Sequence, residues 1–182
     1  MARQADTGAT YSFTIPVFIR SLRNLEKLLA LSERHAKRHK IDPAILLQTR
    51  LYPDMYSLLQ QLQYACFIPV DFARHFTDAP PPRVGYDEAS LADVKASLKQ
   101  TIAYLRAIKP QRFVSSGATL LPLFFDSSRG LQPEAHASRL TIPDFFFHVS
   151  MAYAILRHNG VPLGKADFLG PLDAVAIKKA KT

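Results

Sequence analysis

Cysteine is nearly absent from this 182-residue chain, which contains only Cys66. A single cysteine cannot form an internal disulfide, so a hydrophobic core must hold the fold, and the chain suits a reducing compartment. No apolar run near the N-terminus is long enough for a secretory or membrane-spanning segment. We therefore expect a soluble cytoplasmic protein with one domain, because a chain that is 48% hydrophobic can bury one sizeable core.

The sequence also lacks the short motifs that identify several common enzyme classes. It contains no G-x-S-x-G nucleophile elbow, no C-x-x-C pair, no Walker A phosphate loop and no dinucleotide-binding glycine pattern. The sequence assigns no histidine to Cys66, and we interpret this cysteine as a small core residue. Any chemistry must therefore come from side chains that the fold brings together.

Acidic residues are outnumbered by basic ones, and the formal net charge is +8. Much of the excess lies in two runs, ERHAKRHK at 33–40 and IKKAKT at 177–182. Neither run has the interleaved aromatic residues of a base-stacking surface, and the helix dipole alone favours cations near helix C-termini. We therefore expect neither a nucleic-acid nor a membrane partner. His35 and His39 have the spacing of metal ligands, but the flanking cations disfavour a metal, and we interpret this run as a solvated helix end.

Apolar residues recur at helical spacing in four segments, which predicts an all-α fold. The segments are residues 16–40, 42–75, 90–109 and 141–159. Pro16 suits the first turn of the first helix, and Pro53 predicts a kink within the second. Gly160 suits the left-handed position that ends the last helix. The tail after it should be ordered, because its apolar side chains need burial.

Two capping boxes predict helix starts, one formed by Ser90 with Asp93 and the other by Thr141 with Asp144. A long crossover at 111–140 separates the last two helices. Its segment ATLLPLFFD is β-prone but contains a proline, which predicts an edge strand or a short irregular hairpin. Four amphipathic helices with one long crossover predict a four-helix bundle.

Polar residues border the apolar face of the second helical segment. On a helical wheel, Arg50, Asp54 and Gln61 fall within about 40° of one another. His148 lies on the apolar face of the last segment, and Tyr153 lies near the boundary of that face. We therefore expect His148 to meet Asp54 or Gln61 in the interior of the bundle.

Two interpretations of this arrangement remain open. In the first, the bundle holds a small-molecule site in which His148 and Asp54 are the catalytic acid and base or bind a divalent metal. Arg50 would then bind an anionic group, and Gln61 and Tyr153 would contact the substrate. In the second, the protein is a non-catalytic ligand-binding or dimeric interaction module, and the polar network fixes the register of the helices.

Two blocks of sequence, RLYPDMYSLLQQLQYA at 50–65 and IPDFFFHVSMAYAILRHNGVPLGKADFLG at 142–170, resemble a domain-of-unknown-function family. That family occurs in bacteria and fungi and is grouped with the DinB/YfiT-like metalloenzymes. The similarity extends over about residues 11–170. It implies a single domain at 1–182 with a DinB-like four-helix bundle as its core, and a homodimer.

The resemblance also implies a metal site, because three histidines commonly hold a divalent metal in this superfamily. Two of those ligands come from an H-x-x-x-H motif on the last helix. In this sequence Ala152 follows His148 at the second of those positions. At the position on the second helix, the nearest candidate ligand is Asp54, which carries a carboxylate in place of an imidazole.

Overall fold

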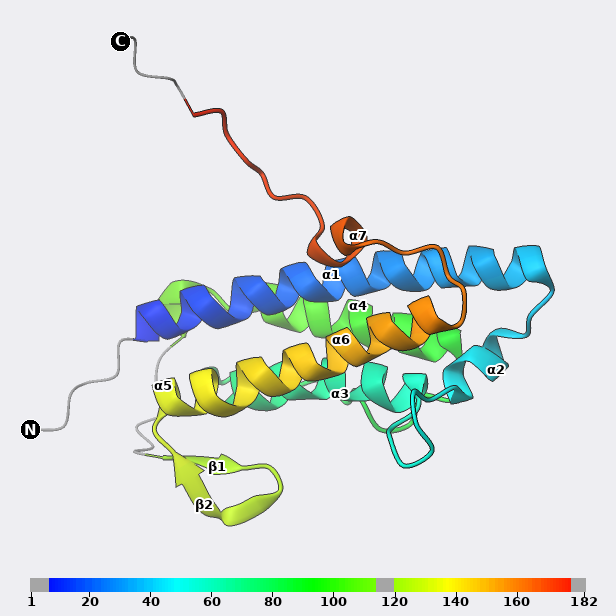
Figure 1. Cartoon of the computed structure of the whole chain (residues 1–182). Helices are drawn as coiled ribbons and strands as arrows, with labels where there is room; N and C mark the ends of the chain where they lie inside the picture. The colour runs from blue at the N-terminus through cyan, green and yellow to red at the C-terminus, as the bar shows by residue number, and fades with distance from the viewer. Residues whose placement is uncertain (1–6, 114–119, 178–182) are drawn as a thin grey trace, which may run out of the picture.

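The computed structural model describes residues 7–113 and 120–177 (Figure 1). The part of the expected crossover at 114–119, and the basic run beyond residue 177, lie outside these ranges. Helices dominate the described chain, and a two-stranded antiparallel sheet is the exception. Among the described residues, no helix is both long and apolar enough to cross a lipid bilayer.

Helix α1 spans Thr7–His39 and therefore begins well before its expected start at Pro16. Proline inside a helix removes one backbone hydrogen bond. On either side of this proline, Ile15 and Phe18 are fully buried, and the hydroxyl of Thr14 donates to the carbonyl of Thr10 at 2.6 Å. Burial of the apolar face thus stabilises the helix on both sides of the proline, as is usual when tertiary packing supports a helix.

Helix α2 is short and spans Pro43–Gln48. Asp42 caps its start, as expected, by accepting a hydrogen bond from the backbone N–H of Ala44 at 2.9 Å. The helix ends at Gln48, and the backbone of the next residue, Thr49, is extended. The expected kinked helix running through Pro53 is therefore wrong, because the chain leaves the helical conformation before it reaches this proline.

Helix α3 spans Leu58–Ala73 and begins at a capping box that Ser57 forms with Gln60. This cap fixes a new helix start after the loop that contains Pro53. A second proline, Pro69, lies inside α3 without ending it. The 3₁₀ turn η1, Arg74–Phe76, completes the segment close to its expected end.

A buried carboxylate organises the chain between η1 and helix α4. Glu88 accepts hydrogen bonds from the hydroxyl of Ser97, from the backbone N–H of Gly85 at 2.8 Å and from the side chain of Gln63 at 3.2 Å. Burial alone would raise the pKa of Glu88, but these hydrogen bonds hold it below its usual value. Glu88 thereby fastens this connection to α3 and α4.

Helix α4 spans Leu91–Ala107, and the predicted capping box of Ser90 and Asp93 is present. It is followed by the 3₁₀ turn η2, Pro110–Arg112. Beyond 114–119, strands β1 (Leu121–Leu123) and β2 (Asp126–Leu131) pair antiparallel. The short hairpin expected in the crossover is therefore present.

The last long helix does not begin at the predicted cap. Helix α5 (Pro133–His136), the π-helical turn η3 (Ala137–Thr141) and helix α6 (Ile142–His158) follow one another without a break. Thr141 has helical backbone angles, φ −58° and ψ −51°, and its hydroxyl donates to the carbonyl of His136 at 3.2 Å. The carboxylate of Asp144 is therefore not required for capping.

Gly160 ends this helix with φ +82°, as predicted. The chain then turns back, and the short helix α7 (Lys165–Leu169) packs against α1. The side-chain amide of Asn24 donates to the carbonyls of Phe168 and Leu169 at 3.2 and 2.9 Å. Figure 1 shows α1, α3, α4 and α6 side by side, with α3 packed against both α6 and α4.

Candidate functional site

The structure brings together His148 and Gln61, two residues that the sequence places in a common site. His148 lies on α6, is 5% exposed and faces α3. Its Nδ1 atom lies 2.7 Å from Oε1 of Gln61, which is itself 1% exposed. This is a short hydrogen bond between two buried side chains, and it joins the two helices at this level.

The second contact of Gln61 fixes which nitrogen of His148 carries a proton. The amide nitrogen Nε2 of Gln61 donates to the carbonyl oxygen of Tyr56 at 3.4 Å, so the amide oxygen must face the imidazole. An oxygen only accepts, and Nδ1 of His148 must therefore be the protonated nitrogen. The remaining ring nitrogen, Nε2, lies 3.4 Å from Oδ1 of Asp144.

Asp144 is the carboxylate that sequence reasoning missed at this site. It precedes His148 by one helical turn, and its side chain is 23% exposed. Its second oxygen, Oδ2, is enclosed but accepts no hydrogen bond from the described residues. The available signal was the spacing of Asp144 and His148, which puts both side chains on one face of a helix. Assigning Asp144 to a cap concealed that signal.

The contact between Asp144 and His148 pairs two acceptors when the imidazole is neutral. With the proton of a neutral imidazole on Nδ1, Nε2 is an acceptor and faces a carboxylate oxygen, which is also an acceptor. Two acceptors at 3.4 Å are satisfied when the ring carries a second proton or when a bound molecule places a donor between them. The pair can therefore hold or transfer a proton at a defined position.

Two tyrosines extend the imidazole into an aromatic stack. The ring of His148 lies parallel to Tyr64, with centroids 4.7 Å apart, and Tyr64 stacks on Tyr56 at 5.2 Å. The hydrogen bond with Tyr56, followed by burial and the nearby charge of Asp144, raises the pKa of Tyr64 to about 12. The phenol of Tyr64 is therefore uncharged at neutral pH.

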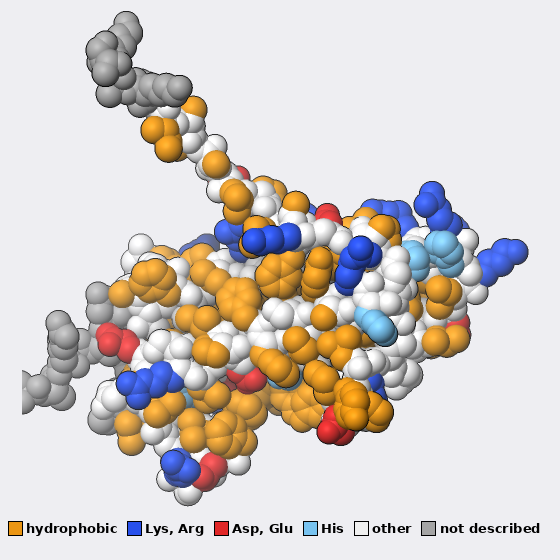
Figure 2. Space-filling view, in the orientation of Figure 1, with side chains coloured by type: hydrophobic (Ala, Val, Ile, Leu, Met, Phe, Trp, Pro, Cys, Tyr) orange, Lys and Arg blue, Asp and Glu red, His pale blue; other side chains and the backbone are white. Residues whose placement is uncertain are grey.

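The stack belongs to a larger aromatic surface, which we define as Tyr56, Tyr64, Phe67, Tyr86, Phe124, Phe125 and Phe147. Phe67 links the stack on α3 to Tyr86, with centroids at 5.7 Å, and to Phe124 of the hairpin at 5.9 Å. Tyr86, Phe125 and Phe147 are 61%, 65% and 50% exposed. Figure 2 shows hydrophobic side chains gathered over α6 and the β1–β2 hairpin.

The structure does not bring three other predicted residues to His148. Asp54 and Arg50 lie in the exposed loop between α2 and α3, and Nη1 of Arg50 donates to the carbonyl of Met55 at 2.5 Å. Among the described carboxylates, that of Asp144 lies within 4.0 Å of the imidazole. The predicted helical, inward placement of Asp54 is therefore wrong, because the helix ends before it.

Tyr153 faces a different part of the fold. Its ring packs edge-on against Phe168 of α7, with centroids 5.6 Å apart. Phe168 belongs to α7, which packs against α1. The structure therefore gives Tyr153 a packing contact with the tail in place of the expected position beside Gln61.

The residues present do not fit the three-histidine metal site that the resemblance implies. Ala152 is fully buried and has no ligating atom, and the position one turn before His148 holds the carboxylate of Asp144. No group of three or more His, Cys, Asp or Glu among the described residues is arranged to hold a metal ion. Two ligands fall short of the three or more protein ligands typical of transition-metal sites.

Comparison with known proteins identifies a family and a fold. The model of the DUF1993 family, a domain of unknown function, matches residues 10–169. The crystal structure of a DinB family member protein from Shewanella denitrificans is similar, with a TM-score of 0.85 and 29% sequence identity. The similarity covers 94% of this chain and 97% of that chain. No curated protein matches the sequence significantly.

Proposed function

Because the chain belongs to the DUF1993 family and has the fold of a DinB family member, we propose that it binds a small molecule between α3 and α6 for proton-transfer chemistry. One observation carries this proposal: Nε2 of His148, which is an acceptor in the neutral ring, and Oδ1 of Asp144 face each other at 3.4 Å. A ligand with an N–H or O–H group satisfies both acceptors at once. In this proposal the four long helices form a bundle that holds the site.

Each polar residue has a distinct part in the proposed site. Gln61 orients the imidazole and keeps the proton on Nδ1, so that Nε2 is free to accept the proton of the ligand. Asp144 reaches the surface more than His148 does, and its carboxylate accepts from the same donor group or stabilises the imidazolium that forms. This division of tasks is that of an acid–base pair with an orienting amide.

The surrounding rings indicate the kind of ligand. Tyr56 is 42% exposed at the outer end of the stack, and Phe147 meets the imidazole edge-on at 5.3 Å. Ring faces of this type bind planar apolar groups through burial and stacking. We therefore propose a planar molecule that carries a hydrogen-bond donor at its edge.

Two aspartate-to-asparagine substitutions, one in the site and one outside it, test this site. We propose to follow the binding of benzimidazole, indole and 2-aminopyridine by two-dimensional amide NMR of the wild-type protein. Perturbed amides should lie on α3 and α6, and Asp144→Asn should abolish or strongly weaken the binding. The matched control is Asp54→Asn, which removes a carboxylate in the exposed loop and should leave binding unchanged. Equal binding by wild type and Asp144→Asn would count against the site.

A second candidate function rests on the exposure of the aromatic surface. Tyr86, Phe125 and Phe147 present large apolar area to solvent, and contiguous patches of this kind mark interaction surfaces. The protein would then be a dimeric interaction module, and the contacts of His148 would fix how α3 packs on α6. Light scattering of the wild type and of Phe125→Ser at matched concentrations distinguishes this function, since a wild type that stays monomeric excludes the dimer.

A further inference from the structure

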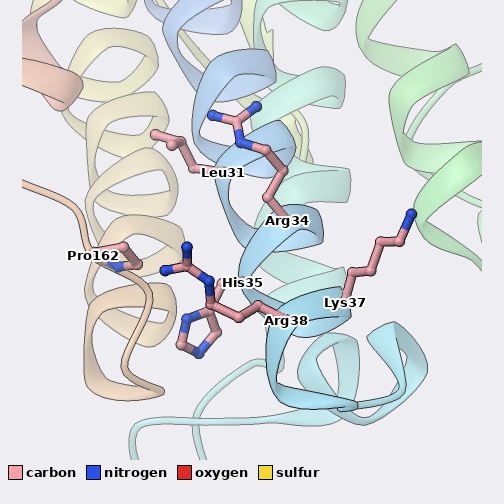
Figure 3. A pocket seen from close by; sticks show the side chains of 6 residues that line it. All are labelled: Leu31, Arg34, His35, Lys37, Arg38 and Pro162. Atoms are coloured by element: carbon pink, nitrogen blue, oxygen red, sulfur yellow. The ribbon is translucent and has the colours of Figure 1, made fainter.

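A groove lies at the C-terminal end of α1, and none of the residues that line it belongs to the aromatic surface. Its volume is about 460 Å³, within the range of ligand-binding pockets. Figure 3 shows the side chains that line it, which are Leu31, Arg34, His35, Lys37, Arg38 and Pro162. The run from 33 to 40, which the sequence presents as a solvated helix end, therefore forms one side of a hollow.

The opposite side of the groove is a well-anchored turn. Pro162 is exposed, but its neighbours Val161 and Leu163 are buried at 0% and 5% exposure. The backbone N–H of Val161 donates to the carbonyl of Leu156 at 3.1 Å, and that of Leu163 donates to Val161 at 2.8 Å. The position of Pro162 is thus fixed from both sides, and the groove does not need a partner to shape it.

None of the described carboxylates forms an ion pair with the arginine and lysine side chains of this groove. The side chains of Arg34, Lys37 and Arg38 are exposed and form no ion pair or hydrogen bond with the described residues. The adjacent carboxylate of Glu33 is occupied by Lys95 at 2.7 Å. The helix dipole accounts for cations near this helix end, but it does not account for their placement around a hollow with an apolar wall.

We propose that this groove binds a small soluble organic phosphate. Guanidinium groups, such as those of Arg34 and Arg38, suit phosphate oxygens, and Lys37, which extends away from Pro162 in Figure 3, adds positive charge at the rim. Leu31 and Pro162 provide apolar contact for the organic part of the same molecule. The groove therefore selects a compact dianion with an attached apolar group over a bare anion.

Phenyl phosphate is the probe for this site, with inorganic phosphate and phenol as comparisons. Amide NMR titration of the wild type should show saturable one-to-one binding, with shifts at the end of α1 and in the turn at 160–164. Phenyl phosphate should bind more tightly than either comparison. Replacing both arginines, in Arg34→Gln/Arg38→Gln, should weaken this binding about tenfold or more, because charge-assisted hydrogen bonds are lost.

The matched control removes the same charge elsewhere on the surface. Lys99 and Arg139 are exposed and do not line this groove. Lys99→Gln/Arg139→Gln should leave the affinity for phenyl phosphate nearly unchanged. An equal loss in both double variants would show attraction by net charge and overturn the proposal. Circular dichroism checks that each variant retains the helix content of the wild type.

A lipid headgroup carries the same phosphate chemistry, and a vesicle experiment separates the two sources. Sedimentation with phosphatidylserine vesicles and with neutral phosphatidylcholine vesicles should show no binding to either. Binding to the phosphatidylserine vesicles without binding of phenyl phosphate would overturn the assignment to a soluble ligand. Equal affinity for phenyl phosphate and inorganic phosphate would overturn the role of the apolar wall, and no binding of phenyl phosphate would overturn the site.

Discussion

Replacing Gln61 by leucine tests the hydrogen bond on which the proposed site depends. The substitution keeps a side chain of similar size but removes the oxygen that lies 2.7 Å from Nδ1 of His148. Both residues are almost fully buried, so water cannot readily replace that oxygen. Leaving a buried donor without an acceptor costs about 1–3 kcal/mol, and we expect the free energy of unfolding to fall by that amount.

A double-mutant cycle separates this contact from general packing effects. In Gln61→Leu/His148→Phe, neither partner remains, so no buried donor is left without an acceptor. The sum of the two single destabilisations should therefore exceed that of the double variant, with a coupling of about 0.5–3 kcal/mol. Urea unfolding followed by circular dichroism measures each value, and the slopes must agree for the comparison to hold.

The control for the cycle is Gln100→Leu, at an exposed position of α4, which should change stability by less than about 0.5 kcal/mol. Long-range proton–nitrogen NMR of the wild type should show the tautomer of His148 with its proton on Nδ1. Equal stability of Gln61→Leu and the wild type, or a neutral ring with its proton on Nε2, would contradict this hydrogen bond.

Three other properties of the structure give further predictions. Gly85 has φ +83°, and a Cβ there would lie 2.7 Å from the carbonyl oxygen of Gln63, so Gly85→Ala should cost about 1–3 kcal/mol in urea unfolding. Gly164→Ala, whose Cβ meets nothing closer than 3.7 Å, should cost less than about 1 kcal/mol, and equal costs would contradict this. The pKa of Glu88 is lower in the folded protein than in the unfolded chain. As the pH falls, the unfolded chain therefore binds a proton at Glu88 before the folded protein does. The stability that Glu88 contributes should be present above about pH 4.3 and lost below it. In a plot of the urea midpoint against pH, Glu88→Gln should therefore reduce the fall of the midpoint in this acidic range. Burial raises the pKa of Cys66 to about 12, so an aromatic disulfide reagent at pH 8 should label the native protein far more slowly than the unfolded protein. Rapid labelling of the native thiol would show that Cys66 is accessible.

The candidate site shows how far local rules reach. The apolar periodicity of the last helix places His148 inward, and the structure puts it there. The same kind of rule assigned Asp144 to a helix cap. In the structure α5 and η3 precede α6 without a break, so no helix begins at Thr141 and there is no cap for Asp144 to form. Tyr64 shares a face of α3 with Gln61 by its spacing, yet its stacking on the imidazole depends on how α3 and α6 pack.

Proline is another point where a local signal had two possible outcomes. Pro16 and Pro69 lie inside helices, whereas the chain around Pro53 is a loop. The missing backbone N–H is the same in each case. What differs is the surroundings, because buried apolar residues flank Pro16 and Pro69, while the cap at Ser57 starts a new helix after Pro53.

Sequence patterns alone were enough to predict the helix start at Ser90, the helix end at Gly160 and the inward direction of His148. These features depend on side-chain periodicity and on backbone preferences over a few neighbouring residues, which a sequence contains directly. The contacts of His148 with Gln61 and Asp144, and the exposed position of Asp54, became visible in the folded chain. Those contacts depend on where one helix stops and how the next packs, and packing between distant segments selects among conformations that local signals leave nearly equal in energy.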